Sequence, residues 1–143
     1  MNIILEYKYV IVPALTWLGI QIFKVITDLI KTRRFNFKRI MGAGGMPSSH
    51  SAVVTSLATM IGKNQGVNTP IFGIAMIFAL VVMYDAAGVR RAAGKQAKLL
   101  NKIVETPGLT GIQVSEKLVE VLGHTPMQVV VGAVLGIIVG LIV

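Results

Sequence analysis

The segments YVIVPALTWLGIQIFKVITDLI, residues 9–30, and PMQVVVGAVLGIIVGLIV, residues 126–143, are almost continuously apolar. An α-helix needs about 20 mostly apolar residues to cross a bilayer, and both segments approach that length. Across the 143 residues, 54% are hydrophobic and only 14% are charged. A soluble domain of this size would not need two such segments for its core, so the sequence predicts an integral membrane protein.

Two shorter helices are predicted between these segments, over residues 47–61 and 71–84. Thr69-Pro70 and Thr125-Pro126 each combine a capping residue with a proline in the first turn, which is typical of helix starts. We therefore predict an all-α bundle of about four transmembrane helices, which forms a single membrane-embedded domain over residues 1–143.

Polar and small residues within the apolar segments predict helix contacts. Gln21, Lys24 and Asp28 occupy the second half of the first segment, and polar groups at this depth are expected to face other helices or the interface. Small residues recur every four positions on the last segment, at Gly132, Gly136 and Gly140. This spacing favours close helix packing, either within one chain or between the subunits of a homo-oligomer.

The polar segment of residues 85–125 carries basic side chains at helical spacing, at Arg91, Lys95, Lys98 and Lys102. This pattern predicts an amphipathic, interfacial helix that lies on an anionic membrane surface. A shorter amphipathic pattern follows it, with Val114, Leu118, Val121 and Leu122.

The net charge of +8 is distributed unevenly along the chain. Five Lys and Arg residues lie in residues 31–49 and six lie in residues 85–125. In a soluble protein this charge would suggest nucleic-acid binding, but in a membrane protein it reports topology, and no nucleic-acid partner is expected. The positive-inside rule places both polar segments in the cytoplasm and both termini outside.

The chain has two histidines, and each lies beside a predicted helix start on the same predicted side of the membrane. His50 occurs in MPSSHSA, residues 46–52, and His124 occurs in GHTPMQ, residues 123–128. The start of a helix offers free backbone N–H groups and the positive end of its dipole, which suit a phosphate group. The absence of cysteine excludes a thiol nucleophile and a disulfide.

These residues suit phosphoryl transfer. The reaction needs a nucleophile, a proton donor for the leaving oxygen and cations around the phosphate oxygens. The histidines can fill the first two roles near neutral pH. Candidate cations are Arg33, Arg34, Lys38, Arg39, Arg90 and Arg91. No metal or other cofactor is expected, because Asp28 and Asp85 are the only aspartates.

The sequence of residues 46–52 resembles the Pro-Ser-Gly-His signature of the type 2 phosphatidic acid phosphatase and vanadium-dependent haloperoxidase superfamily. Together with YDAAGVRR at 84–91, GKQA at 94–97 and residues 123–128, it makes nearly the whole chain similar to a divergent bacterial branch of that superfamily. The resemblance implies that Ser48 and the backbone of Ser49 bind phosphate. It also implies that His50 is the general acid and that His124 is a nucleophile that forms a phosphohistidine.

The chain departs from the superfamily pattern at four places. Ser49 stands where the superfamily usually has glycine, which is a small change. The arginine expected six residues before the nucleophile falls on Leu118, so Arg90 or Arg91 would have to replace it. The aspartate expected four residues after the nucleophile falls on Gln128, and Asp85 or Glu120 could substitute for that carboxylate through space. The first motif of the superfamily is only approximated, by Lys31 and Lys38.

Three functions remain open on the sequence alone. The resemblance favours a membrane lipid phosphatase that hydrolyses a lipid phosphate or a prenyl phosphate or diphosphate, with its active face in the cytoplasm. The alternative is a catalytically inactive phospholipid-binding or transport protein that retains the phosphate pocket. A structural membrane subunit is the third reading, and it leaves the two histidine motifs unexplained.

Overall fold

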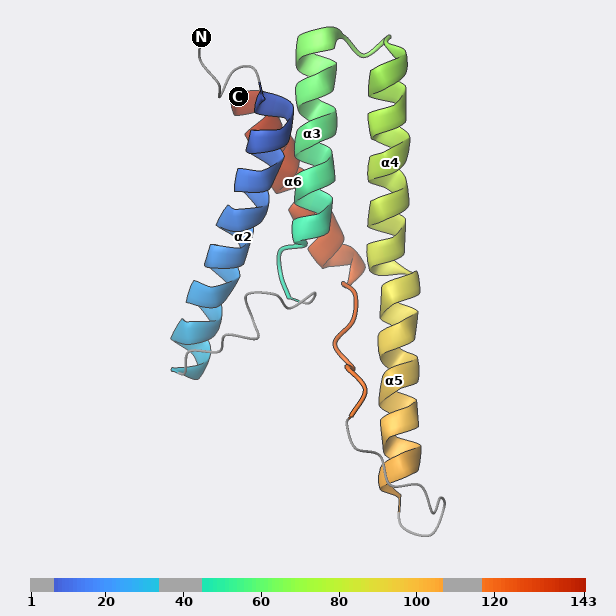
Figure 1. The fold of residues 1–143 in the computed structure, drawn as a ribbon. Helices are drawn as coiled ribbons and strands as arrows, with labels where there is room; N and C mark the ends of the chain where they lie inside the picture. The colour runs from blue at the N-terminus through green and yellow to red at the C-terminus, as the bar shows by residue number, and fades with distance from the viewer. Residues whose placement is uncertain (1–6, 34–44, 107–116) are drawn as a thin grey trace.

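The computed structural model describes residues 7–33, 45–106 and 117–143. Within those ranges the chain forms five helices and no strand: α2 (Lys8–Thr32), α3 (Ser49–Gln65), α4 (Pro70–Ala87), α5 (Val89–Glu105) and α6 (Pro126–Ile142) (Figure 1). The prediction of an all-α membrane bundle is confirmed, and each predicted membrane segment corresponds to one helix.

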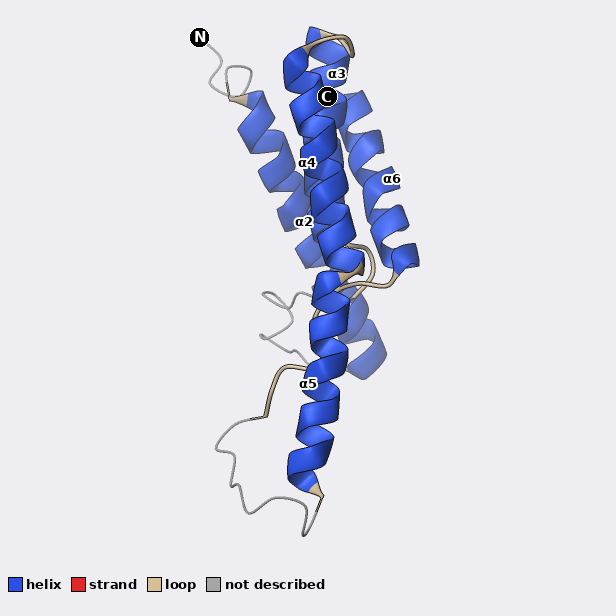
Figure 2. Ribbon diagram, turned by 90° about the vertical axis from the view of Figure 1, so that its right-hand side faces the viewer, coloured by secondary structure: helices blue, strands red, loops and turns tan. Residues whose placement is uncertain are grey.

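Helix α3 lies at the centre of the bundle, and α2, α4 and α6 pack around it (Figures 1 and 2). Its buried positions are mostly small or hydroxyl-bearing, including Ser49, Ala52, Thr55, Ser56 and Ala58. Small side chains let neighbouring backbones approach closely, and packing of this kind holds helices together where lipid removes the hydrophobic driving force. This explains how a short and rather polar helix can occupy the centre of a membrane bundle.

The strongest contact joins α3 to α6 along the predicted glycine stripe. A side chain at Gly132 would overlap the carbonyl of Ser48, and one at Gly136 would overlap the carbonyl of Ala52. The hydroxyl of Thr55 donates a hydrogen bond of 3.0 Å to the carbonyl of Ala133 on α6. The stripe therefore serves packing within one chain, which was one of the two predicted alternatives.

The four bundle helices share two ends. At one end, the ammonium of Lys8 bonds Asn64 at 2.8 Å and that of Lys63 bonds the carbonyl of Leu141 at 2.7 Å. At the other end, the backbone N–H of His124 bonds the carbonyl of Ala86 at 2.9 Å. Residues 8–30 and the continuous helical stretch 70–105 are long and apolar enough to cross a membrane, and α6 is apolar but shorter.

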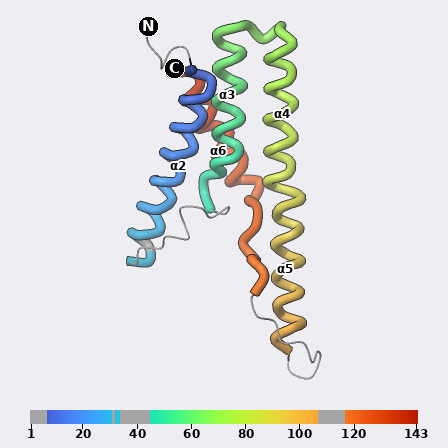
Figure 3. The backbone as a smooth tube through the Cα atoms, in the orientation of Figure 1, coloured from blue at the N-terminus to red at the C-terminus, as the bar shows by residue number. Residues whose placement is uncertain are grey.

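Helix α5 continues beyond α4 in nearly the same direction, so it stands out from the end of the bundle (Figures 1 and 3). The sequence predicted that this helix lies flat on the membrane surface. The physical reason for the difference is that only Gly88 separates the two helices, and its backbone N–H bonds the carbonyl of Tyr84 and thereby completes the last turn of α4.

The second amphipathic pattern is not helical in the part that the structure describes, because residues 117–125 run back along α5 as an extended segment. The side-chain amide of Asn101 bonds both the N–H and the carbonyl of Leu118, at 3.0 and 2.8 Å. Gly94 leaves room for the backbone of Glu120, whose carbonyl would lie 2.5 Å from an added Cβ. Asn101 thus satisfies both backbone groups of Leu118, which a helix would otherwise pair, and Gly94 allows the segment to approach α5 closely.

Candidate functional site

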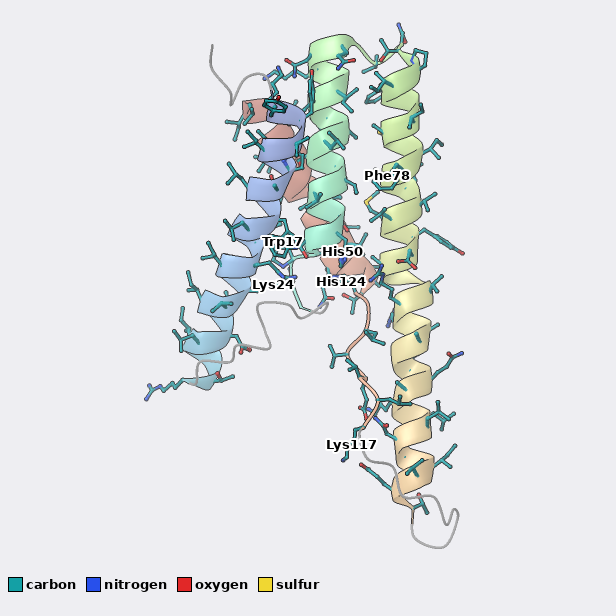
Figure 4. The ribbon with its side chains drawn as sticks, viewed as in Figure 1. Trp17, Lys24, His50, Phe78, Lys117 and His124 are labelled. Atoms are coloured by element: carbon teal, nitrogen blue, oxygen red, sulfur yellow. The ribbon has the colours of Figure 1, made fainter. Side chains whose placement is uncertain are left out.

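The two histidines lie side by side at the end of the bundle where α3 and α6 begin. His50 is in the first turn of α3, and His124 lies two residues before the start of α6. Their ring centroids are 5.9 Å apart and their planes meet at 63° (Figure 4). An attack distance of about 3 Å, a P–O bond of about 1.6 Å and a hydrogen bond of about 2.8 Å together span more than the gap between the rings, so one phosphoryl group could contact both of them.

Backbone contacts fix the positions of the two histidines relative to each other. The N–H of Ser48 bonds the carbonyl of Gln128 at 3.0 Å, which ties the start of α3 to the first turn of α6. Thr125 caps α6, and its hydroxyl accepts from the N–H of Gln128 at 3.4 Å in a capping box. The predicted helix start at Thr125-Pro126 is therefore confirmed, and it also fixes the position of His124.

His124 is only 1% exposed, and its ring is oriented by Gln128. The Nδ1 atom lies 3.3 Å from Oε1 of Gln128, and the backbone N–H of Thr125 donates to the same oxygen at 3.0 Å. Because a backbone N–H can meet only an acceptor, that atom is the amide oxygen, and Nδ1 must donate to it. The lone pair then lies on Nε2, which is buried and has no hydrogen-bond partner among the described residues.

Burial lowers the pKa of His124 below its ordinary value of 6.5, and the positive charge of Lys24 lowers it further, although the contacts with Gln128 and with the backbone of Gly45 oppose the shift. The ring is therefore neutral at pH 7, as a nucleophile must be. Below pH 6.5 an unfolded chain takes up the proton that the folded chain excludes from this ring. The contribution of His124 to folding thus becomes less favourable as the pH falls through that value.

Gln128 occupies the place where the resemblance expected an aspartate, which leads to a prediction. A Gln128→Asp variant should raise the pKa of His124 by about one unit or more relative to a Gln128→Asn variant, because a carboxylate stabilises the imidazolium. Asn and Asp have the same size, so the pair isolates the charge. NMR titration of the histidine ring signals measures both values, and identical titrations would show that position 128 does not act on His124.

Lys24 is the site residue that the sequence analysis did not assign to the site. It lies on α2, is 3% exposed, and places its ammonium 3.4 Å from the hydroxyl of Ser49. Its charge acts on the rings of both His50 and His124, and Figure 4 shows it beside them. A lysine inside an apolar span is itself a functional signal, but the sequence could not show which residues it faces.

The serines of the signature are buried at the start of α3. The hydroxyl of Ser48 accepts the N–H of Ser51 at 3.4 Å, so this side chain caps the helix. Ser49 contacts Lys24, as described above. The hydroxyl of Ser51 is buried without a hydrogen-bond partner in the part of the chain that the structure describes.

Each histidine lines a different cavity. A cavity of about 470 Å³ on the membrane side is lined by His50, and a cavity of about 300 Å³ beside α5 is lined by His124. The first also contains Asp85 and Arg90, which form an ion pair. The second contains the basic side chains of Arg91, Lys95 and Lys98 together with Gln128. A larger apolar cavity of about 530 Å³ between α3, α4 and α6 touches neither histidine.

The remaining predicted residues fall into two groups. Arg90 and Arg91 approach the histidine pair from α5, each in a different cavity. Asp85 pairs with Arg90, and Glu120 accepts a hydrogen bond of 3.0 Å from Asn101. The partner of Nδ1 of His124 is Gln128 and neither of these carboxylates. Lys38, Arg39 and Arg34 lie outside the described residues. Within the described ranges, no three His, Asp or Glu side chains gather where they could hold a metal ion.

Comparison with known proteins identifies similar sequences. The family described as "Divergent PAP2 family" matches residues 5–139 of the chain. The chain is 38% identical over 133 residues to the uncharacterized membrane protein YuiD of Bacillus subtilis (strain 168), a match that covers 85% of this chain and 84% of that protein. No solved structure matches the chain.

Proposed function

Because the chain belongs to the divergent PAP2 family, we propose that it is a membrane lipid phosphatase with a histidine nucleophile. The observation that carries the proposal is the buried Nε2 of His124, which has no hydrogen-bond partner among the described residues and lies in a ring 5.9 Å from that of His50. A buried polar atom without a partner is costly, and such atoms are retained where a ligand uses them.

In the first step, the Nε2 lone pair of His124 attacks the phosphorus of the lipid phosphate. An N–P bond forms and the ester P–O bond breaks, and its electron pair stays on the leaving oxygen. His50, whose protonated form is stabilised by the negative charge of the bound phosphate, gives a proton to that oxygen, so the lipid alcohol leaves neutral. The products of this step are the alcohol, a phosphohistidine at His124 and a neutral His50.

In the second step, water replaces the alcohol. His50 takes a proton from the water as its oxygen attacks phosphorus, the N–P bond breaks, and the electron pair returns to Nε2 of His124. Inorganic phosphate is released and both histidines return to their starting states. The net reaction consumes one water and needs no redox partner.

Positive groups around the pair support the charge that develops on the phosphate oxygens. Lys24 is buried beside both rings, and Arg90 and Arg91 approach from α5. The first turn of α3 also directs its free backbone N–H groups toward this end of the bundle. Fixed charges and dipoles in a site that excludes water stabilise such transition states more strongly than they would in water.

A second function is favoured by one observation. Gln128 is neutral where the resemblance expects a carboxylate, so it orients His124 without stabilising the imidazolium form. A phospholipid-binding or transport protein that has lost catalysis would keep the cations and the cavity.

Phosphate release from a panel of lipid phosphates tests the two functions. The phosphatase should release phosphate in the presence of EDTA and should be inhibited by vanadate, which mimics the transferred phosphoryl group. Vanadate binding without release from any lipid would establish the binding protein and overturn the phosphatase.

We also propose that the site faces the cytoplasm. Among the described residues, the histidine end and α5 carry Arg33, Arg90, Arg91, Lys95, Lys98, Lys102 and Lys117, whereas the opposite end carries Lys8 and Lys63. This asymmetry follows the positive-inside rule.

The natural chain has no cysteine, so single cysteines report the orientation directly. A membrane-impermeant maleimide applied to intact cells should label Asn68→Cys, in the turn between α3 and α4, and should not label Lys102→Cys until the cells are opened. The reverse pattern would place the site on the outer face.

A further inference from the structure

The membrane-side cavity has a composition that restricts the substrate. Its walls are formed by Trp17 of α2, Val53 and Val54 of α3, and Phe78, Val81 and Val82 of α4, and His50 lies at its polar end with Asp85 and Arg90. Figure 4 shows Trp17 and Phe78 on the two helices that flank α3, with Trp17 at about the level of His50 and Phe78 farther toward the turn between α3 and α4. A volume of about 470 Å³, apolar walls and a few polar groups are typical of a ligand site.

The in-line geometry of phosphoryl transfer determines which part of the substrate enters this cavity. The nucleophile and the leaving oxygen lie on opposite sides of the phosphorus. If His124 attacks, the leaving oxygen faces His50, and the group attached to that oxygen extends past His50. His50 lines the membrane-side cavity, whereas His124 lines the basic cavity beside α5.

The walls of the cavity favour a substrate whose hydrocarbon chain is attached directly to the phosphate oxygen. In a phosphatidate, a glycerol unit with two ester carbonyls lies between the phosphate and the chains. Those carbonyls would lie beside valine side chains, which offer no hydrogen-bond donor, and Arg90 lies at the polar end of the cavity, where its Nε donates to Asp85. A buried carbonyl without a hydrogen-bond donor is unfavourable, whereas a methylene chain gains from burial against the same walls.

We propose that the substrate is the phosphate monoester of a single-chain alcohol, an alkyl or prenyl phosphate, whose chain lies in the cavity between Trp17 and Phe78. This inference rests on the proposed function and names its substrate class. The half-exposed faces of Trp17 and Phe78 leave the cavity open to the bilayer, so the chain enters sideways from the membrane.

Trp17 is the only tryptophan in the chain, so its fluorescence reports on the cavity without a label. The probe is an alkyl phosphonate, which is not hydrolysed, with bromine atoms on its chain. It is added to the full-length protein in nanodiscs of unbrominated lipid. Saturable quenching of Trp17 is expected, and a choline lipid with the same brominated chain should quench only in proportion to its concentration in the membrane. Equal quenching by both would overturn the proposal.

A pair of variants on one helix tests the wall of the cavity. Phe78→Ala should weaken phosphonate binding about tenfold through the loss of apolar contact, whereas Ile77→Ala should change it less than about twofold. Phe78 is 54% exposed and Ile77 is 62% exposed, and only Phe78 lines the cavity, so neither variant should impair folding. Equal effects of the two substitutions would contradict the assignment.

Hydrolysis separates this inference from the proposed function. Prenyl or alkyl phosphate should be hydrolysed with a kcat/KM at least about tenfold above that of phosphatidate with the same number of carbons, because the glycerol carbonyls lose their hydrogen bonds on entry. Phosphatidate as the better substrate would overturn the single-chain inference and leave the phosphatase standing. Release from neither would overturn the phosphatase, while quenching by the phosphonate would still show that the cavity holds a chain.

Discussion

Replacing His124 by alanine should abolish phosphate release, with kcat lowered at least about 10⁴-fold, because the variant has no atom that can form the covalent intermediate. Phosphate released from the best lipid substrate of the natural protein measures the effect. Phosphate analogues should still bind the variant, since Lys24 and the start of α3 remain. A His124→Ala variant that keeps more than a tenth of the natural kcat would refute the nucleophile assignment.

The matching substitution at His50 distinguishes the two roles. His50→Ala should lower kcat by about 10² to 10⁴, the usual contribution of a general acid. A substrate with a strongly acidic leaving group, such as a nitrophenyl phosphate with an attached alkyl chain, needs no proton on leaving. It should restore the first step in His50→Ala, measured as a burst of nitrophenol, and should restore nothing in His124→Ala. Later turnovers of His50→Ala should stay slow, because hydrolysis of the phosphohistidine still needs His50 as a base. Equal rescue of both variants would show that the roles are not divided in this way.

Lys24→Met offers a further contrast with these variants, because methionine keeps the length of the side chain and removes its charge. Weaker binding of phosphate and vanadate is expected, together with a higher pKa of His124, since the lysine charge is one cause that lowers it. Loss of structure would expose the ring and would also raise this pKa. The circular dichroism spectrum and thermal unfolding of Lys24→Met must therefore match those of the natural protein, and an unchanged pKa of His124 in a folded variant would contradict the role of the lysine charge.

Gly136→Ala should destabilise the fold by at least about 2 kcal/mol. An added Cβ would overlap the carbonyl of Ala52 and the hydroxyl of Thr55, and α3 and α6 would have to separate. Backbone atoms cannot move aside as a flexible side chain can. Thermal unfolding in detergent, followed by circular dichroism, measures the loss, and activity should fall with it because the same helix pair positions His50 and His124.

The control for this variant is Gly73→Ala on α4. Nothing lies within 4 Å of a Cβ added at Gly73, and alanine favours helix over glycine by about 1 kcal/mol. The control should therefore be as stable as the natural protein or slightly more stable. If Gly136→Ala matched it, the contact between α3 and α6 would not depend on the absence of a side chain.

The sequence by itself determined the helices and their starts. Apolar length predicted α2 and α6, and Thr-Pro pairs marked the first residues of α4 and α6, because these signals depend on neighbouring residues and on the thickness of a bilayer. The glycine repeat predicted close packing for the same local reason. Only its partner was left open, since the same stripe can pack within a chain or between chains.

The tertiary structure decided how the site is composed. Lys24 and His124 are far apart in the chain, and only the packing of α2 and α6 against α3 brings them together. Gln128 proved to be the partner of His124 because the capping box directs its amide oxygen to the imidazole. Residues 117–125 are extended because of contacts with α5: Asn101 bonds the backbone of Leu118, and Gly94 leaves room for the backbone of Glu120. Periodicity describes one segment at a time, whereas these contacts arise between segments.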